Sequence, residues 1–145
     1  MTTAPQTYQN HVRWHKPFHF FLVPVFLINF IWSAVEFFMS PGWDQGRWVV
    51  VSFALIVLTL LTRINALRAQ DRVIRLEEQL RYQRVLPADL AQRASALTVW
   101  QIIALRFASD AELPELVRAT LDNKFAKSDE IKRAIKQWRP DMVRV

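Results

Sequence analysis

The stretch LTLLTRINALRAQDRVIRLEEQLR, residues 58–81, decides the fold because it changes from an apolar to a charged composition without a break. Leu58–Thr62 is suited to hydrocarbon, whereas Arg68–Arg81 requires water or a polar surface. Neither Gly nor Pro occurs anywhere in residues 47–86. This continuity predicts one helix of about 60 Å that leaves a bilayer and continues as a stem.

Apolar and charged residues are unevenly distributed along the 145-residue chain. Eight of the ten Phe and four of the six Trp lie in the first 53 residues, whereas the last 78 residues carry 15 Lys and Arg and 11 Asp and Glu. The absence of Cys excludes disulfides, thiolate nucleophiles and Cys-based zinc sites. Only two Gly occur, close together, which excludes a glycine-rich phosphate loop.

Two segments have the length and composition of membrane spans. Phe18–Met39 contains 22 residues and would extend about 33 Å as a helix, close to the thickness of the hydrocarbon core. The second span is expected at residues 48–67, with the guanidinium of Arg63 reaching the headgroups. Residues 40–48 contain both glycines and are expected to form the turn. Pro24 predicts a kink in the first span.

Basic residues flank the two open ends of this hairpin, opposite the turn, whereas the charges of the turn itself cancel. Arg13 and Lys16 precede the first span, and Arg63, Arg68 and Arg72 follow the second. The positive-inside rule therefore predicts that both termini are cytoplasmic.

Polar residues within the spans allow two interpretations. Asn29 lies near the middle of the first span and Glu36 near its outer end, while Ser52 and Thr59 lie one heptad apart on the second. They would form an ion path if several copies assembled into a small channel. The favoured alternative is helix–helix hydrogen bonding, with Glu36 at the interface or paired with Arg47.

The stem carries a short apolar stripe of Val73, Leu76 and Leu80, with Ala66 and Ala69 in the same phase. Glu77 and Arg81 have the spacing of a favourable surface ion pair. The stripe is short for a coiled coil, yet it must be covered. Either the C-terminal helices fold onto it or a second copy of the chain does.

Beyond the stem, capping signals predict a small unit of short amphipathic helices. Thr98 and Gln101 have the spacing of a capping box, as do Ser109 and Glu112. The expected helices cover residues 88–97, 98–107, 109–123 and 131–138, with Pro140 ending the last.

The three histidines, His11, His15 and His19, recur every four residues, a spacing that suits a metal ion or haem iron on one helix. However, Pro17 interrupts the series, and the residue before a proline avoids helical conformation. We therefore favour a position at the headgroups, with metal or haem binding as an alternative and no cofactor expected.

No other site chemistry stands out. The basic residues of the last predicted helix are moderated by neighbouring carboxylates, so contact with anionic lipid is favoured over nucleic acid. No nucleophile–base pair or paired carboxylates share a face, so we do not expect an enzyme.

The stretches TYQNHVRWHKPFHFF (7–21), LTVWQIIALRFASDAELPELV (97–117) and IKRAIKQWRPDMVRV (131–145) resemble an uncharacterised family of short bacterial proteins with two predicted spans and a cytoplasmic tail. The resemblance implies a bacterial inner-membrane protein and no particular activity. It implies that two sets of residues in the matched stretches are important to the protein. They are, near the N-terminus, Asn10, His11, Arg13 and His19, and, in the C-terminal unit, Leu105, Arg106, Phe107, Asp110, Trp138, Arg139, Pro140 and Asp141.

From these matched ends we expect the N-terminal segment to pack against the C-terminal unit. Arg106 with Asp110, or Arg139 with Asp141, would be the ion pairs that hold it.

The expected fold is all-α: a two-span hairpin whose second helix continues as a cytoplasmic stem, followed by a small helical unit. Its expected parts are residues 1–17 (cytoplasmic segment), 18–67 (hairpin), 68–86 (stem) and 87–145 (helical domain). The expected role is structural, through self-association or as an accessory subunit of a membrane complex, with the bilayer and another membrane protein or a second copy as partners.

Overall fold

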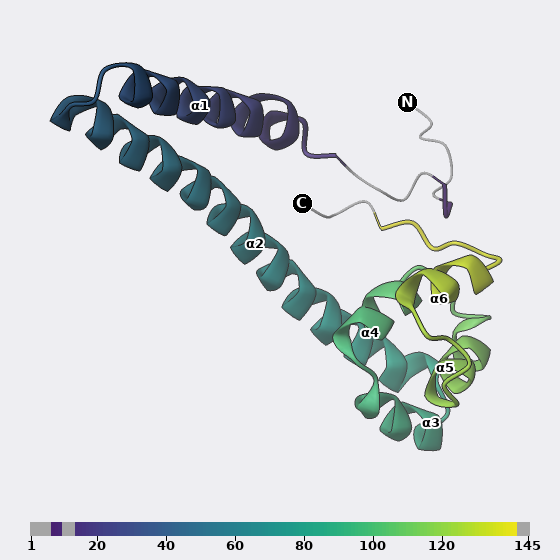
Figure 1. Cartoon of the computed structure of the whole chain (residues 1–145). Helices are drawn as coiled ribbons and strands as arrows, with labels where there is room; N and C mark the ends of the chain where they lie inside the picture. The colour runs from purple at the N-terminus through teal and green to yellow at the C-terminus, as the bar shows by residue number, and fades with distance from the viewer. Residues whose placement is uncertain (1–6, 10–13, 142–145) are drawn as a thin grey trace. The chain divides into compact units, whose positions relative to one another are not determined.

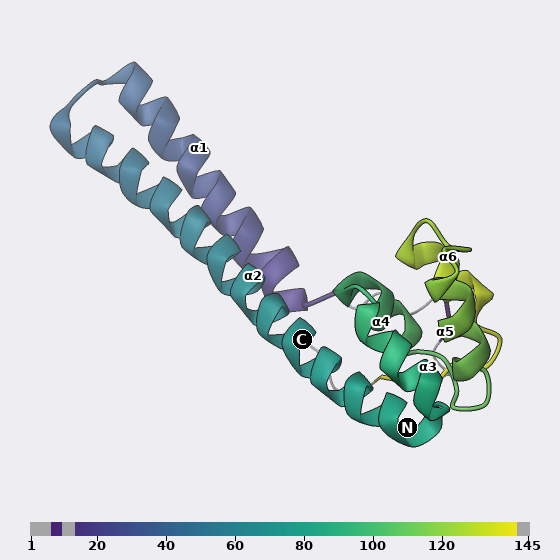
Figure 2. The ribbon, with the colours of Figure 1, turned by 90° about the horizontal axis from the view of Figure 1, so that it is seen from below.

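A computed structural model describes residues 7–9 and 14–141 of the chain. It contains two compact units, one formed by residues 13–67 and the other by residues 68–144 together with residues 1–12. Helix α2 (Trp43–Val85) contributes to both units and has no break, which confirms the predicted continuity (Figures 1 and 2). The all-α fold is confirmed, since no strand occurs within the described ranges.

The first unit is an antiparallel hairpin. A π-helix (Phe18–Leu22) and helix α1 (Val23–Met39) form its first arm, and the N-terminal half of α2 forms the second. Pro24 has no N–H to donate, and the helix preceding it is widened, with Val23 N–H bonding the carbonyl of Phe18. Phe18–Met39 and Trp43–Val85 are both long and apolar enough to cross a membrane.

The turn of the hairpin is shorter than predicted. Helix α2 begins at Trp43, so the expected turn at residues 40–48 is wrong at its C-terminal end. Only Gly42 lies in the connection, whereas Gly46 lies in the first turns of α2. A Cβ at Gly46 would lie 3.4 Å from the ring of Phe37, a distance of ordinary van der Waals contact, so Gly46 lies close beside the other arm.

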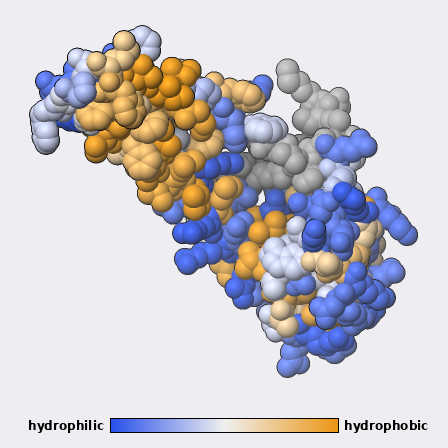
Figure 3. All heavy atoms as spheres, in the orientation of Figure 1, coloured by the Kyte–Doolittle hydropathy of each residue, from blue (hydrophilic) through white to orange (hydrophobic). Residues whose placement is uncertain are grey.

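The second unit gathers short helices around one apolar core. Its helices are α3 (Ala88–Arg93), the 3₁₀ helix Ala94–Ala96, α4 (Val99–Leu105), α5 (Leu113–Leu121) and α6 (Ser128–Ala134). Leu90, Leu105, Phe107, Leu113 and Ile131 are fully buried there. Figure 3 shows the contrast in surface chemistry, with hydrophobic residues over the hairpin and mostly hydrophilic residues over this unit.

Local capping signals position these helices. The capping box of Thr98 and Gln101 is present at the start of α4, as predicted. Helix α5 ends with Asn123 in the left-handed region, at φ 56°. The N–H of Lys124 bonds the carbonyl of Ala119, and that of Asn123 bonds Thr120, which together satisfy the open carbonyls of the helix end.

The last predicted helix, residues 131–138, is wrong beyond Ala134. From Ile135 the chain is extended, and Trp138 forms an antiparallel bridge with Ala108. The N–H of Arg139 donates to the carbonyl of Phe107 at 2.7 Å, and the N–H of Ser109 donates to that of Gln137. These long-range backbone bonds, with the ring of Trp138 packed 5.0 Å from that of Phe107, replace the helical bonds.

Candidate functional site: an ion-pair cluster and the exposed face of α2

Two charged residues of α2, Glu78 and Arg81, are buried in the C-terminal unit, each with only 4% of its surface exposed. Arg81 donates to Glu78 at 3.0 Å, to Asp110 at 2.8 Å and to the carbonyl of Ala108 at 2.7 Å. Each buried charge therefore has an opposite charge beside it, which is the condition for keeping charges in a protein interior.

The C-terminal segment completes this ion-pair cluster. Nη1 of Arg139 lies 3.3 Å from Oε1 of Glu78, and Nε of Arg106 lies 3.2 Å from Oδ2 of Asp141. These side chains border a cavity of about 70 Å³ together with Pro140. That space holds about two water molecules, so the cluster is a structural joint rather than a substrate pocket.

The sequence identified most of these residues but paired them differently. The predicted pairs were Arg106 with Asp110 and Arg139 with Asp141. Instead, Asp110 pairs with Arg81, and Asp141 pairs with Arg106. The prediction missed Glu78 and wrongly placed Arg81 in a surface ion pair with Glu77, because charged residues on a stem are expected in water. The one sequence signal for Glu78 and Arg81 was their position on the side of the helix opposite the apolar stripe.

Two titratable groups of α2 have pKa values displaced by this environment. Burial raises the pKa of Glu78 above its ordinary value, since the loss of hydration outweighs the attraction of Arg81, Arg139 and Arg106. Burial also raises the pKa of Tyr82, and the nearby charge of Glu78 adds to this effect. Both groups are components of the packed interior, and neither lies in a cleft open to a substrate.

Glu112 is a further carboxylate whose role the sequence did not reveal. It was expected to serve a capping box with Ser109. Its oxygens accept the backbone N–H groups of Gln137 at 2.7 Å and of Lys136 at 3.0 Å. Glu112 therefore holds the extended segment after α6 against the start of α5.

The cluster determines which face of α2 is buried. Ile74, Glu78 and Tyr82 face the C-terminal helices. The apolar stripe lies on the opposite side of the helix, about half a turn away. It is exposed: Val73 by 53%, Leu76 by 63% and Leu80 by 62%. The alternative in which the C-terminal helices cover this stripe is therefore wrong.

Within the hairpin, the predicted interhelical hydrogen bond is present. Asn29 Nδ2 donates to the Oγ of Ser52 at 2.7 Å, and the hydroxyls of Ser33 and Ser52 lie 3.2 Å apart. Ser52 is fully buried, so these small residues allow close helix packing. Thr59 instead donates to the carbonyl of Leu55 in its own helix.

The charged residues of the hairpin have local partners. Glu36 accepts a hydrogen bond from Trp32 Nε1 at 2.6 Å. Arg47 forms an exposed ion pair with Asp44 at 3.3 Å, so the expected pairing of Glu36 with Arg47 is not the one formed. The guanidinium of Arg63 lies over the ring of Phe18, at 5.8 Å, where the first arm begins.

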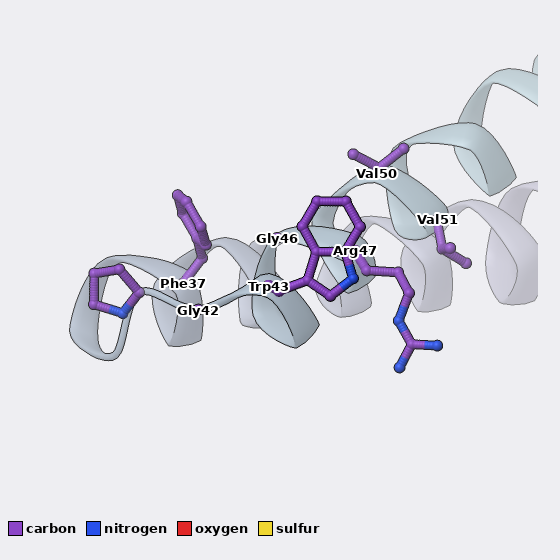
Figure 4. A pocket seen from close by; sticks show the side chains of 8 residues that line it. Phe37, Gly42, Trp43, Gly46, Arg47, Val50 and Val51 are labelled. Atoms are coloured by element: carbon purple, nitrogen blue, oxygen red, sulfur yellow. The ribbon is translucent and has the colours of Figure 1, made fainter.

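An apolar groove of about 650 Å³ lies at the turn of the hairpin (Figure 4). Its lining includes Phe37, Trp43, Val50 and Val51, with Arg47 as its charged member. Because these side chains are apolar and the groove is open, it suits the acyl chain of a lipid better than a polar metabolite.

Two of the three histidines, His15 and His19, lie in the described part of the chain, where the first arm begins. His19 Nδ1 lies 3.0 Å from the backbone carbonyl of His15, and the His19 ring packs against Trp14. His11, with Asn10 and Arg13, lies outside the described residues. Within the described part of the chain, no group of three or more His, Asp and Glu side chains could hold a metal ion.

Tyr8, in the described part of the N-terminal segment, contacts the C-terminal unit. The hydroxyl of Tyr8 donates to Asp129 at 2.8 Å and accepts from Arg133 at 3.1 Å. The hydrogen bond from Tyr8 lowers the pKa of Asp129. The hydrogen bond that Arg133 donates to Tyr8, together with the charge of Asp129, raises the pKa of Arg133. This contact of Tyr8 is made with residues of α6 and not with those of the ion-pair cluster.

Comparison with known proteins gives a family but no activity. The model of a family of unknown function, DUF6526, matches residues 1–145, in agreement with the resemblance to an uncharacterised family. No curated protein and no solved structure matches the chain.

Proposed function

Since the chain belongs to DUF6526, a family of unknown function, we propose a role for it from its own structure. It is a non-enzymatic integral membrane protein that acts as a structural module and associates with further copies of itself. Its hairpin spans the bilayer, and α2 continues from the second span into the C-terminal helical unit.

The exposure of the hairpin supports membrane spanning. In the most apolar windows of the two candidate helices, only 6% and 11% of the residues are buried within the protein. Large apolar side chains such as Phe20, Ile28 and Leu58 are therefore exposed, whereas a core helix of a soluble protein would bury them. Lipid tails would remove these side chains from water, and the helices satisfy their own backbone bonds there.

The proposed orientation places both termini in the cytoplasm of a bacterium, at the inner membrane. This orientation rests on the basic residues at the two open ends of the hairpin, opposite the turn, and on the family resemblance. Arg63 over Phe18 would then mark the inner interface. The C-terminal unit would be tethered beside anionic headgroups, where basic residues such as Lys132 and Lys136 are favourable.

Self-association rests on one observation: the exposed apolar face of Val73, Leu76 and Leu80. This face lies on the charged half of α2, beyond the expected end of the span, so lipid would not cover it. A partner chain that removes it from water gains about 25 cal/mol for each Å² of apolar surface buried.

Native mass spectrometry of the full chain released from membranes tests this proposal. We expect two or more copies of the wild-type protein and a shift toward single copies for Leu76→Ser with Leu80→Ser. The matched control is Arg75→Ser, an exposed position on another face of α2, which should keep the wild-type copy number. A single wild-type copy would refute self-association.

Extraction of the protein by alkaline carbonate would refute membrane spanning.

A further inference from the structure

The exposed face of α2 has the register of a two-stranded interface with a defined orientation. Spacings of three and four residues place Val73 and Leu80 at a positions of a heptad and Leu76 at a d position. Arg72 and Glu77 then occupy the flanking g and e positions, and both are exposed. We infer that the partner on this face is a second copy of the chain, packed parallel and in register; this inference rests on the proposed self-association.

Charge complementarity supports this arrangement. In a parallel in-register pair, a g residue faces the e residue of the following heptad on the partner helix. Arg72 of one copy therefore faces Glu77 of the other, and the twofold axis repeats the contact. Among the described residues, neither Arg72 nor Glu77 forms an ion pair within the chain. Both charges are thus available for a partner.

Membrane topology imposes the same orientation. Two copies inserted with the same topology have their α2 helices parallel and their exits from the bilayer at one depth. An in-register contact requires no shift along the helix. Tethering to one membrane also raises the effective concentration of the second copy, so a face of about two heptads suffices where a free peptide of that length would not associate.

The C-terminal unit leaves room for the second copy. The residues of α2 that it covers, Ile74, Glu78 and Tyr82, occupy b, f and c positions of the same heptads. These positions face away from a two-stranded seam. The ion-pair cluster of Glu78 and Arg81 thus fixes the helical unit on the outer side of the proposed dimer.

Site-directed disulfide formation in membranes tests the orientation, because the natural chain has no Cys. Single substitutions Val73→Cys and Leu80→Cys should each give a disulfide-linked dimer, since like residues meet across a parallel in-register seam. Arg75→Cys, at a c position, is the control and should remain monomeric under the same oxidation. An antiparallel or shifted pair would link neither position to its own copy.

Charge reversal tests the predicted contact. Arg72→Glu alone, or Glu77→Arg alone, should weaken the dimer about tenfold, because two attractions become two repulsions. The double variant should restore it to within about twofold of the wild type. Failure of the double variant to recover would overturn the proposed register.

The two proposals fail in different ways. If native mass spectrometry shows two or more copies while neither Cys variant crosslinks, self-association stands and the parallel seam is wrong. If the wild-type chain is a single copy, both proposals are wrong.

Discussion

Arg139 Nη1 lies 3.3 Å from Glu78 Oε1, although 61 residues separate the two in the sequence. This contact joins the C-terminal segment to the last turns of α2. Together with the contact of Arg81 to Asp110, it selects the face of α2 that the C-terminal helices cover. The other face, with Val73, Leu76 and Leu80, remains exposed.

Replacing Arg81 by Met should strongly destabilise the C-terminal unit. Glu78 would lose its nearest cation and the carbonyl of Ala108 a donor, both in a buried setting. Removing one member of a buried ion pair typically costs about 3–5 kcal/mol. Chemical denaturation of the full chain in detergent, followed by Trp fluorescence, would measure the loss. Arg47→Met, which breaks only the exposed pair with Asp44, should change the free energy of unfolding by less than about 1 kcal/mol; equal losses would contradict the buried cluster.

The stability of the C-terminal unit should depend on pH through Glu78. Because its pKa is raised by folding, the folded chain binds more protons than the unfolded chain in this range. The contribution of Glu78 is therefore largest below its ordinary pKa of 4.5 and is lost as the pH rises through the raised value. Glu78→Gln removes this titration, so the stability of the wild type relative to the variant should fall as the pH rises. A difference that grows with pH would contradict the raised pKa.

Ser52→Ala should loosen the hairpin. The variant loses the hydrogen bond from Asn29 and the contact with Ser33. Such bonds between membrane helices contribute about 0.6–1.7 kcal/mol. Unfolding in mixed micelles of increasing SDS fraction would measure the change. Ile28→Ala, on an exposed part of α1, is the control and should have a smaller effect. An equal or larger loss for Ile28→Ala would argue against the packing of Ser52 between the arms.

Tyr8→Phe should raise the pKa of Asp129 toward its ordinary value of 3.8. The hydrogen bond from Tyr8 is the largest cause of the lowered pKa. A lowered carboxyl pKa stabilises the folded state above the unfolded pKa, and this contribution is lost as the pH falls through the folded value. NMR titration of the carboxyl carbon of Asp129 would measure the shift. An unchanged pKa of Asp129 would show that the Tyr8 contact does not form in solution.

Several predictions that depended on short-range signals agree with the structure, although the turn expected at residues 40–48 ends earlier because α2 begins at Trp43. The capping box of Thr98 and Gln101 needs only four residues, and its hydrogen bonds form within the first turn of α4. The continuity of α2 follows similarly from the absence of Gly and Pro between residues 47 and 86. The lengths of the two apolar segments follow from composition alone.

Predictions that depended on long-range pairing failed in detail. Ile131, Ile135 and Trp138 have helical spacing, yet Ile135 and Trp138 lie in an extended segment. The local helical signal was outweighed by backbone bonds to residues 107–109 and by the carboxylate of Glu112. Similarly, Arg106 pairs with Asp141 rather than with Asp110. Asp110 pairs instead with Arg81, which is 29 residues away in the sequence but beside it in the folded unit.

The amino-acid sequence by itself determined that two long apolar helices form and that the second continues without a break, since apolar composition and helix breakers act locally along the chain. Only the tertiary structure decided which side of α2 is buried. Both of its faces offered apolar residues, and the buried face is the one on which Tyr82 and Leu86 join the apolar core. A buried charge is tolerated only with its partner in place, so this packing also required the distant residues Asp110 and Arg139 beside Arg81 and Glu78.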